Sequence, residues 1–240
     1  MMKKLEQLYE GKAKKVFRTD DPAYLIVEYK DDATAFNGAK KGSIKGKGVI
    51  NNQMTNRFMR RLEQAGIPTH YVEELGERET VVKNVKIVPL EVIVRNISAG
   101  HFASRYGVEE GIVFDAPTVE FSYKCDELDD PLLNTSHAVA LKLATPEELA
   151  QIKKYALAVN EVLRKFWAEC GVTLVDFKVE FGRLPDGTII LADEISPDTC
   201  RLWDSETHEK LDKDRFRRDM GGVEDAYQEV MKRLLTHDAQ

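Results

Sequence analysis

The sequence predicts an α+β fold in which antiparallel strands and amphipathic helices occupy separate stretches of the chain. Three observations carry this prediction. Apolar and polar residues alternate over short stretches, turn-forming Pro, Gly and Asp residues separate them, and three segments repeat apolar residues at helical spacing. At 240 residues the chain is long enough for one large domain or two joined lobes. One group of strands gives way to the next near residues 82–89, where we expect the lobes to meet.

The first part of the chain is expected to form short strands around one helix. The sequence Asp20-Asp21-Pro22 separates two apolar stretches and indicates a hairpin turn. The helix follows a loop rich in Gly and Lys at residues 38–48, and Gly66 and Pro68 end it. Its apolar positions are Val49, Ile50, Met54, Phe58 and Leu62. The strands expected here cover residues 16–17, 24–27, 71–72, 80–82 and 86–95.

Two amphipathic helices are expected in the second part of the chain. The longer one lies between Thr145 and Gly171. Thr145 is the expected N-cap, Glu148 completes a capping box, and Gly171 suits a left-handed helix end. Its buried stripe consists of Leu149, Ile152, Ala156, Val159, Leu163 and Trp167. The shorter helix covers residues 223–235.

A strand–turn–strand segment carries the most informative charges. Val175, Phe177, Val179 and Phe181 are expected to face the core, and Asp176, Lys178 and Glu180 to share the opposite face. The turn Pro185-Asp186-Gly187 would bring Asp193 close to Glu180. Two opposed carboxylates repel unless a cation or proton lies between them, and magnesium binds one or two carboxylates together with phosphate oxygens. A surface hairpin with a polar outer face is the alternative interpretation.

Lysines near the start of the chain indicate a phosphate site. In an extended strand, Lys12 and Lys14 would project from the same face, and Gly11 permits a close approach or a sharp turn before them. Two ammonium groups beside exposed amides suit a polyphosphate, although a solvated basic edge strand is the alternative. Residues 42–48 lack the spacing of a Walker phosphate loop and of a dinucleotide-binding fingerprint.

Two arginines are expected at strand ends. Arg95 ends the apolar stretch 89–94, and the residues after it, up to His101, could open a helix that binds an anion. Arg201 follows a proline-containing loop that also presents Asp198. Arginine binds carboxylate or phosphate with two parallel hydrogen bonds. A structural role for each arginine stays open.

Composition excludes several classes of function. A formal net charge of -6 disfavours nucleic acid as the main partner. No stretch is apolar over the roughly 18 residues that a membrane helix needs, and the N-terminus lacks the apolar core of a secretory signal. The three scattered cysteines suit a reducing compartment, and no zinc-binding spacing is present. We expect a cytoplasmic protein with no membrane partner.

The motifs together resemble those of the bacterial SAICAR synthetase family, in the same order, from Tyr9 to Leu235. The motifs that carry the resemblance are Gly11-Lys12-Ala13-Lys14, Pro89 to Val92 with Val94-Arg95-Asn96, Asp130-Pro131-Leu132, Asp176 to Gly182, and Asp193 to Asp204. The resemblance implies a two-lobed, ATP-grasp-like fold with the nucleotide in a cleft between the lobes. Residues 1–85 would form the ATP-binding lobe, and residues 86–240 would carry the magnesium and ribonucleotide sites.

The same resemblance implies a reaction and its ligands. ATP, carboxyaminoimidazole ribonucleotide (CAIR) and L-aspartate would give ADP, phosphate and the succinocarboxamide SAICAR, with Mg²⁺ as cofactor and a homodimer as the usual assembly. The family's ATP-phosphate contacts fall here on Gly11, Lys12, Ala13 and Lys14. The main chain from Val82 to Ile87 would accept adenine. Glu180 and Asp193 would hold the metal.

On the ribonucleotide, the resemblance assigns the phosphate to Arg95 and Arg201. Asp176, Lys178 and Asp198 would lie at the imidazole, with Lys12 and Lys178 in catalytic roles. Asp176 is a candidate base for the aspartate amine by its location alone, and a structural role is equally open.

The sequence departs from the family pattern at two positions, and two rival functions remain. His101 stands where relatives commonly have a serine near the substrate phosphate, and Asn37 replaces an aspartate found in many members. The first rival function is a small-molecule kinase with a similar ATP cleft, although no His-Arg-Asp catalytic loop is present. The second is a nucleotide-binding protein without turnover.

Overall fold

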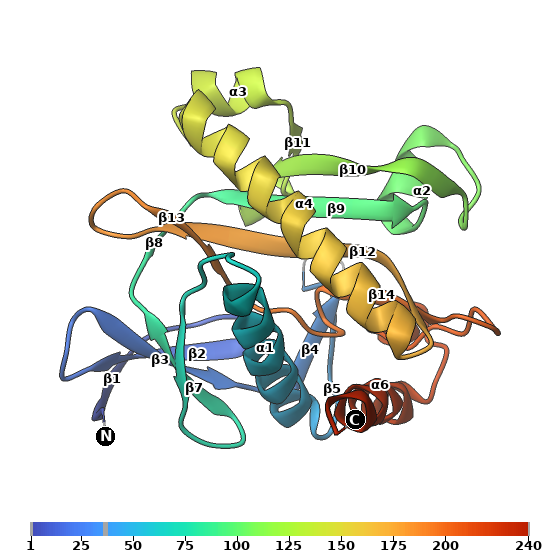
Figure 1. Ribbon diagram of the computed structural model, residues 1–240, viewed down its shortest axis with the longest axis horizontal. Helices are drawn as coiled ribbons and strands as arrows, with labels where there is room; N and C mark the ends of the chain where they lie inside the picture. The colour runs from blue at the N-terminus through green and yellow to red at the C-terminus, as the bar shows by residue number, and fades with distance from the viewer. Residues whose placement is uncertain (1, 36–37, 240) are drawn as a thin grey trace.

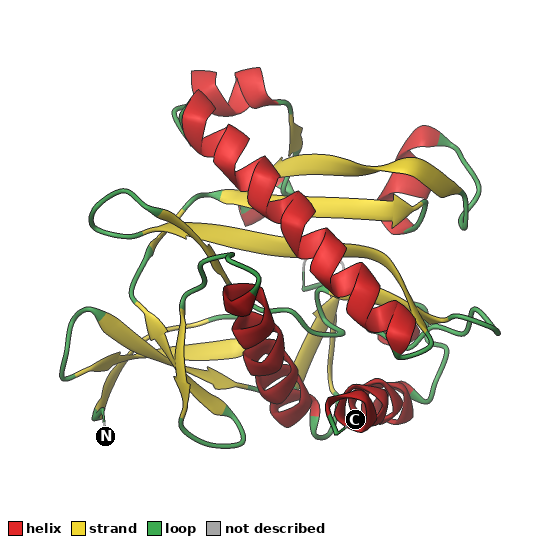
Figure 2. Cartoon of the chain, in the orientation of Figure 1, coloured by secondary structure: helices red, strands yellow, loops and turns green. Residues whose placement is uncertain are grey.

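The computed structural model describes residues 2–35 and 38–239, so Asn37 lies outside the described residues. The fold is α+β, as the sequence predicts: its ladders are antiparallel, and helices lie against them (Figures 1 and 2). No helix in the described ranges is long and apolar enough to cross a membrane.

The first sheet is built from the N-terminal part of the chain. Its order is β1 (Lys4–Glu10), β2 (Lys14–Thr19), β3 (Tyr24–Tyr29), β7 (Glu79–Lys83) and β6 (Tyr71–Glu74). The predicted hairpin around Asp20 to Pro22 is confirmed as β2 and β3. The loop predicted at residues 38–48 is wrong in part, because β5 (Lys40–Ser43) pairs with β4 (Asp32–Ala35). That pairing depends on β4, whose four residues are too few to give a clear alternating pattern.

The second sheet has β12 (Val172–Arg183) near its centre. Its order is β11 (Leu132–Leu133), β10 (Val113–Tyr123), β9 (Leu90–Ile97), β12 and β13 (Ile189–Ala192), and both β14 (Cys200–Asp204) and β8 (Lys86–Ile87) also pair with β12. The strand predicted at residues 86–95 is therefore two strands. The sequence did not predict β10, whose pairing with β9 is irregular between Val113 and Thr118, around a proline.

Six α-helices and one 3₁₀ turn complete the described chain (Figure 1). They are α1 (Lys47–Gln64), α2 (Gly100–Tyr106), η1 (Asp126–Leu128), α3 (Thr135–Ala140), α4 (Pro146–Glu169), α5 (Asp214–Arg217) and α6 (Val223–Asp238). The capping box between Thr145 and Glu148 is confirmed, and Gly171 has the left-handed φ expected after the helix. In Figure 1, α4 crosses the second sheet, where it buries its predicted apolar stripe.

Val16, Val27, Tyr29 and Val82 of the first sheet form a small cluster of their own, and the large core lies between the helices and the second sheet. This large core contains Phe58 of α1, Trp167 of α4 and Tyr227 of α6, all with side chains shielded from solvent. Each such side chain contributes about 1.5–3 kcal/mol through burial. The strands of the first sheet end at Lys83 and those of the second begin at Lys86. The division into two domains at residues 85 and 86 stays a proposal.

The central strand β12 is buried on both faces, which corrects one prediction. Asp176 and Glu180 are as buried as the apolar residues between them. A register irregularity between Leu174 and Asp176 also places Val175 in a separate small cluster with Trp203, away from the main core. The simple alternation of faces is therefore wrong at Val175, because the irregularity shifts the pleat there.

Candidate active site

The two predicted metal carboxylates meet where β13 ends beside the interior of β12, near the first sheet. Glu180 pairs across the hairpin with Ala192, and Asp193 follows directly after β13. Asp193 is therefore not the cross-strand partner of Glu180. Its φ of 62° is left-handed and takes the chain out of the strand direction. The two carboxylates remain close enough that, after burial itself, the charge of Asp193 raises the pKa of Glu180.

Three lysines surround these carboxylates. Lys14 of β2 pairs with Asp193 and, at 3.4 Å, with Glu194. Lys124, just beyond β10, places its Nζ 2.7 Å from both oxygens of Glu180. Lys178 donates to Glu91 at 2.5 Å. The sequence analysis missed Lys124, because its only signal is the tertiary contact with Glu180.

Burial and these lysines together set the charge of Asp193. Burial alone would raise the pKa of the carboxyl, but the positive charges of Lys14 and Lys178 outweigh it and lower the pKa to about 2. Burial lowers the pKa of Lys14, and the charges of Asp193 and Glu194 more than reverse this. The centre therefore holds an ionised Asp193 beside a protonated Lys14, an arrangement suited to a metal ion and phosphate groups.

A buried histidine lies against the same centre. Burial, followed by the charge of Lys14, lowers the pKa of His70 to about 4, so its ring is neutral at physiological pH. No local pattern indicates a role for His70, which stands between a turn and a strand.

Lys12 and Lys14 do not project together from one strand, so that prediction is wrong. Strand β2 begins at Lys14, and Gly11 donates its N–H to the Lys14 carbonyl at 2.8 Å, which closes a tight turn. The sharp turn predicted at Gly11 is thus present. Lys12 lies on this turn, next to Ala13, and forms an ion pair with Asp126 at 3.1 Å. Lys14 therefore contacts Asp193, whereas Lys12 contacts Asp126.

The two predicted arginines meet on one carboxylate. Asp176 of β12 is the register partner of Arg95 on β9 and of Arg201 on β14, so three neighbouring strands bring the side chains together. Arg95 donates to Asp176 at 2.6 Å, and Arg201 donates to it at 2.9 Å. Glu120 and Asp214 hold the outer sides of Arg95 and Arg201 respectively. All these carboxylates orient guanidinium groups.

His101 lies beside this arginine cluster, at the start of α2. Burial lowers its pKa first, and the charge of Arg201 lowers it further. Gly100, just before it, has a φ of 52°, and a Cβ there would lie only 2.3 Å from Nη2 of Arg201. A glycine is therefore required for Arg201 to occupy its place.

Asp198 lies apart from the arginines, in a buried charge network. Its Oδ2 accepts from Lys47 of α1 at 2.9 Å and from Lys213 at 3.2 Å, and Tyr227 of α6 donates to Oδ1. After burial, which raises the pKa of Asp198, the charges of Lys213 and Lys47 lower it far below its usual range. This network connects the loop that precedes Arg201 to two helices.

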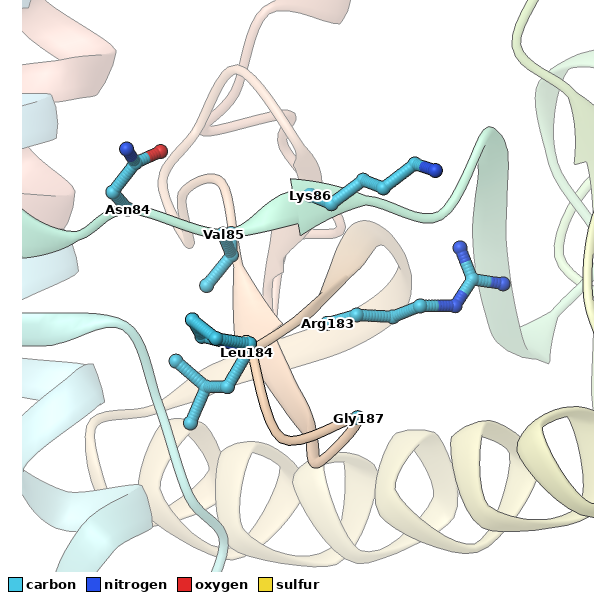
Figure 3. A pocket seen from close by; sticks show the side chains of 7 residues that line it. Asn84, Val85, Lys86, Arg183, Leu184 and Gly187 are labelled. Atoms are coloured by element: carbon cyan, nitrogen blue, oxygen red, sulfur yellow. The ribbon is translucent and has the colours of Figure 1, made fainter. Parts of the chain in front are cut away.

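The segment predicted to contact adenine forms the connection between the sheets. Val82 is buried in β7, and Ile87 is half-buried in β8. Between them, residues 84–86 line a pocket of about 500 Å³ with the β12–β13 turn (Figure 3). Neither Val82 nor Ile87 lines that pocket.

Comparisons with known proteins identify the family of the chain. The family profile of SAICAR synthetases matches residues 7–234. A phosphoribosylaminoimidazole-succinocarboxamide synthase from Lachnoclostridium phytofermentans is 67% identical over 233 residues, which cover 97% of this chain and 99% of that protein. One from Coprothermobacter proteolyticus is 60% identical over the same shares.

Solved structures give the same result. A phosphoribosylaminoimidazole-succinocarboxamide synthase from Ehrlichia chaffeensis superposes with a TM-score of 0.94 at 44% identity, covering 95% of this chain and 98% of that one. A SAICAR synthetase in complex with ADP superposes with a TM-score of 0.92 at 48% identity, covering 95% and 97%.

The fold and these relatives thus define an enzyme, a carbon–nitrogen ligase. The chain belongs to the SAICAR synthetase family, which acts in purine biosynthesis.

Proposed function

We propose that this enzyme uses ATP and Mg²⁺ to join CAIR and L-aspartate into SAICAR, with release of ADP and phosphate. The observation that carries the proposal is the meeting of Glu180 and Asp193 with Lys14, Lys124 and Lys178 where the two sheets adjoin. A homodimer in the cytoplasm belongs to the same proposal.

Nucleotide binding is supported by the lysines and by the relative that was solved with ADP. Lys14 and Lys12, with the main chain of Gly11 and Ala13, bind the phosphates. The connection from Val82 to Ile87 receives the adenine. Lys14 pairs with Asp193. Its ammonium group therefore lies beside the carboxylates that act on the same phosphates.

The residues present fit a magnesium ion. Glu180 and Asp193 supply the carboxylate oxygens that this ion prefers, and their mutual repulsion, which helps to raise the pKa of Glu180, falls when a cation lies between them. When bound, magnesium supplies neutralising charge to the phosphates. Lys124 and Lys178 provide the remaining positive charge around the centre.

Amide formation needs an activated carboxylate. The CAIR carboxylate attacks the γ-phosphorus of ATP, and the bond from this phosphorus to the bridging oxygen breaks. ADP departs, and the CAIR carboxylate has become an acyl phosphate. The aspartate amine then attacks the acyl carbon, phosphate departs, and the nitrogen loses a proton. Lys12, Lys14 and Lys178 hold the transferring phosphoryl group and its charge, since such transfer depends on positioning and electrostatics.

Arg95 and Arg201 bind the ribonucleotide phosphate, with His101 beside them and Asp198 on the loop that leads to Arg201. Of the two roles open for Asp176, the contacts favour the structural one. Both of its oxygens accept hydrogen bonds from guanidinium groups. Its carboxylate therefore orients the arginines.

Product analysis tests the proposed function directly. Purified protein is mixed with ATP, Mg²⁺ and CAIR, with and without L-aspartate, and the products are identified by mass spectrometry. SAICAR, ADP and phosphate in equal amounts, formed only with aspartate, are the expected result. ADP released without aspartate, together with a product that keeps the phosphate, would instead establish the kinase alternative.

A further inference from the structure

Strand β5 contacts the short helix α5 through two residues on one face. Lys40 and Gly42 alternate with the exposed Lys41, so they lie on the same side of the strand. The Lys40 ammonium donates to the carbonyl of Phe216, 176 residues further along the chain, at 2.6 Å, and lies 4.9 Å from the centre of the Phe216 ring. A Cβ at Gly42 would lie 2.9 Å from Cε2 of that ring. The strand and the helix therefore meet in a close contact.

The bond from Lys40 to the carbonyl is the stronger of its two attachments to this segment. Lys40 also pairs with Asp219 at 2.6 Å, but the Asp219 side chain is 85% exposed, and an ion pair with so exposed a partner contributes little. The Lys40 side chain is only 24% exposed. Its charge lies at the C-terminal end of α5, where the helix carbonyls favour a cation. Lys40 therefore fastens that end of the helix.

Helix α5 depends on such contacts to keep its place. It has four residues, no side-chain hydrogen bond from the described chain caps its start, and a single turn is not stable by itself in water. Arg218, directly after it, pairs with Glu110, but these side chains are 40% and 29% exposed. At the start of the helix, the buried Asp214 accepts from Nε of Arg201 at 2.9 Å. The direction of the Arg201 guanidinium therefore depends on where α5 lies.

We propose that Lys40 is a positioning residue for the ribonucleotide site. By holding the C-terminal end of α5, Lys40 keeps Asp214 in place at the start of the same helix, and Asp214 keeps the Arg201 guanidinium directed at the substrate phosphate. Lys40 acts through these two residues and does not contact the substrate. The inference rests on the phosphate role proposed for Arg201. A strand of the proposed ATP-binding lobe thereby helps to shape the ribonucleotide site.

The test measures the binding of CAIR and, in a separate titration, of ADP to the full chain by calorimetry. Lys40→Met removes the charge but keeps an unbranched side chain, and Lys40→Arg restores a cationic donor. Lys41→Met, on the opposite, exposed face of β5, is the matched control. Lys40→Met is also made in an Arg201→Lys background, where residue 201 keeps its charge but lacks the planar group that can bond Asp214 and phosphate together. Thermal unfolding of each variant checks that it is folded.

Lys40→Met should weaken CAIR binding about tenfold and leave ADP binding unchanged, because α5 holds Arg201 and not the nucleotide site. Lys40→Arg and Lys41→Met should bind CAIR as wild type does. In the Arg201→Lys background, Lys40→Met should cause no further loss beyond about twofold, since the residue through which it acts is already altered.

Four results would each overturn the inference. They are unchanged CAIR binding in Lys40→Met, a loss that Lys40→Arg does not restore, an equal loss of ADP binding, and a full tenfold loss in the Arg201→Lys background. The last result would show that Lys40 contacts the substrate directly.

The same titrations separate the inference from the proposed function. A wild-type chain that does not bind CAIR would contradict the proposed function. CAIR binding that Arg201→Lys leaves at wild-type strength would contradict the phosphate role of Arg201 and the inference with it. Weaker binding in Arg201→Lys together with unchanged binding in Lys40→Met contradicts only the inference.

Discussion

Lys14 forms an ion pair with Asp193, which lies 179 residues further along the chain. The lysine comes from the first sheet and the carboxylate from the end of the second. Their side chains are only 19% and 16% exposed, so the pair lies largely out of water. The active centre therefore exists only when both sheets are in place.

Lys14→Met should lower kcat/KM for ATP by roughly 100-fold, because a positioned charge on a transferring group is worth about that much. Steady-state kinetics with varied ATP measures this change. Lys15→Met is the matched control, since Lys15 follows Lys14 on the same strand and points to the opposite face. Equal losses in both variants would show that the effect is not specific to the centre.

Asp176→Asn should raise the KM for CAIR at least about tenfold and leave the KM for ATP nearly unchanged. Removing the charge that Arg95 and Arg201 share lets the two guanidinium groups repel each other. The pH dependence of kcat separates this role from that of a base. An orienting carboxylate leaves the shape of the profile intact, whereas loss of its acidic limb would identify Asp176 as the base.

Gly100→Ala should raise the KM for CAIR about tenfold or more, because the added methyl group would displace Arg201. Gly107→Ala is a close control: its φ of 63° is similarly left-handed, but no atom of the described residues lies within 4 Å of the place its added methyl group would take. It therefore measures backbone strain alone. A KM for CAIR that changes equally in both variants would exclude displacement of Arg201 as the cause.

Acid should weaken the attachment of α1 through Asp31. The hydrogen bond from Arg78, partly opposed by burial, lowers the pKa of this carboxyl to about 2. Its oxygens also accept from the N–H groups of Gly46 and Gly48 at the start of α1. A depressed folded-state pKa stabilises the protein above the unfolded value near 3.8, and this contribution is lost as pH falls toward 2.

Thermal unfolding of Asp31→Asn measures that contribution. The variant should be less stable than wild type near neutral pH, by about 1 kcal/mol or less, because Arg78 loses its charged partner. The difference should shrink as the pH falls from 4 toward about 2, where wild type also becomes protonated. A difference that stays constant over this range would contradict the assigned ionisation.

Local patterns were sufficient to predict the three long helices, α1, α4 and α6, but not the short helices α3 and α5. The Thr145 capping box and the glycine after α4 placed that helix to within about a residue, because both signals are local in sequence. Strands without such signals, such as β10 and β5, were missed or misassigned. Their pairing partners lie outside the local pattern, and pairing rather than propensity defines them.

The charged residues of the centre were predicted better than their contacts. The tight turn at Asp186 predicted that Glu180 and Asp193 approach each other, but not the register that opposes Glu180 to Ala192. Lys124 and His70 belong to no motif, and only the folded chain brings them to the carboxylates. Short spacings thus predict pairs within one hairpin, whereas contacts between sheets require the structure.

Turnover of Asp193→Asn tests the central claim most directly. A neutral amide is a poorer magnesium ligand, so kcat should fall by roughly 100-fold or more while thermal unfolding stays cooperative. Asp186→Asn, at the exposed turn of the same hairpin, should keep wild-type turnover. Turnover of Asp193→Asn equal to that of wild type, at the same magnesium concentration, would contradict the account.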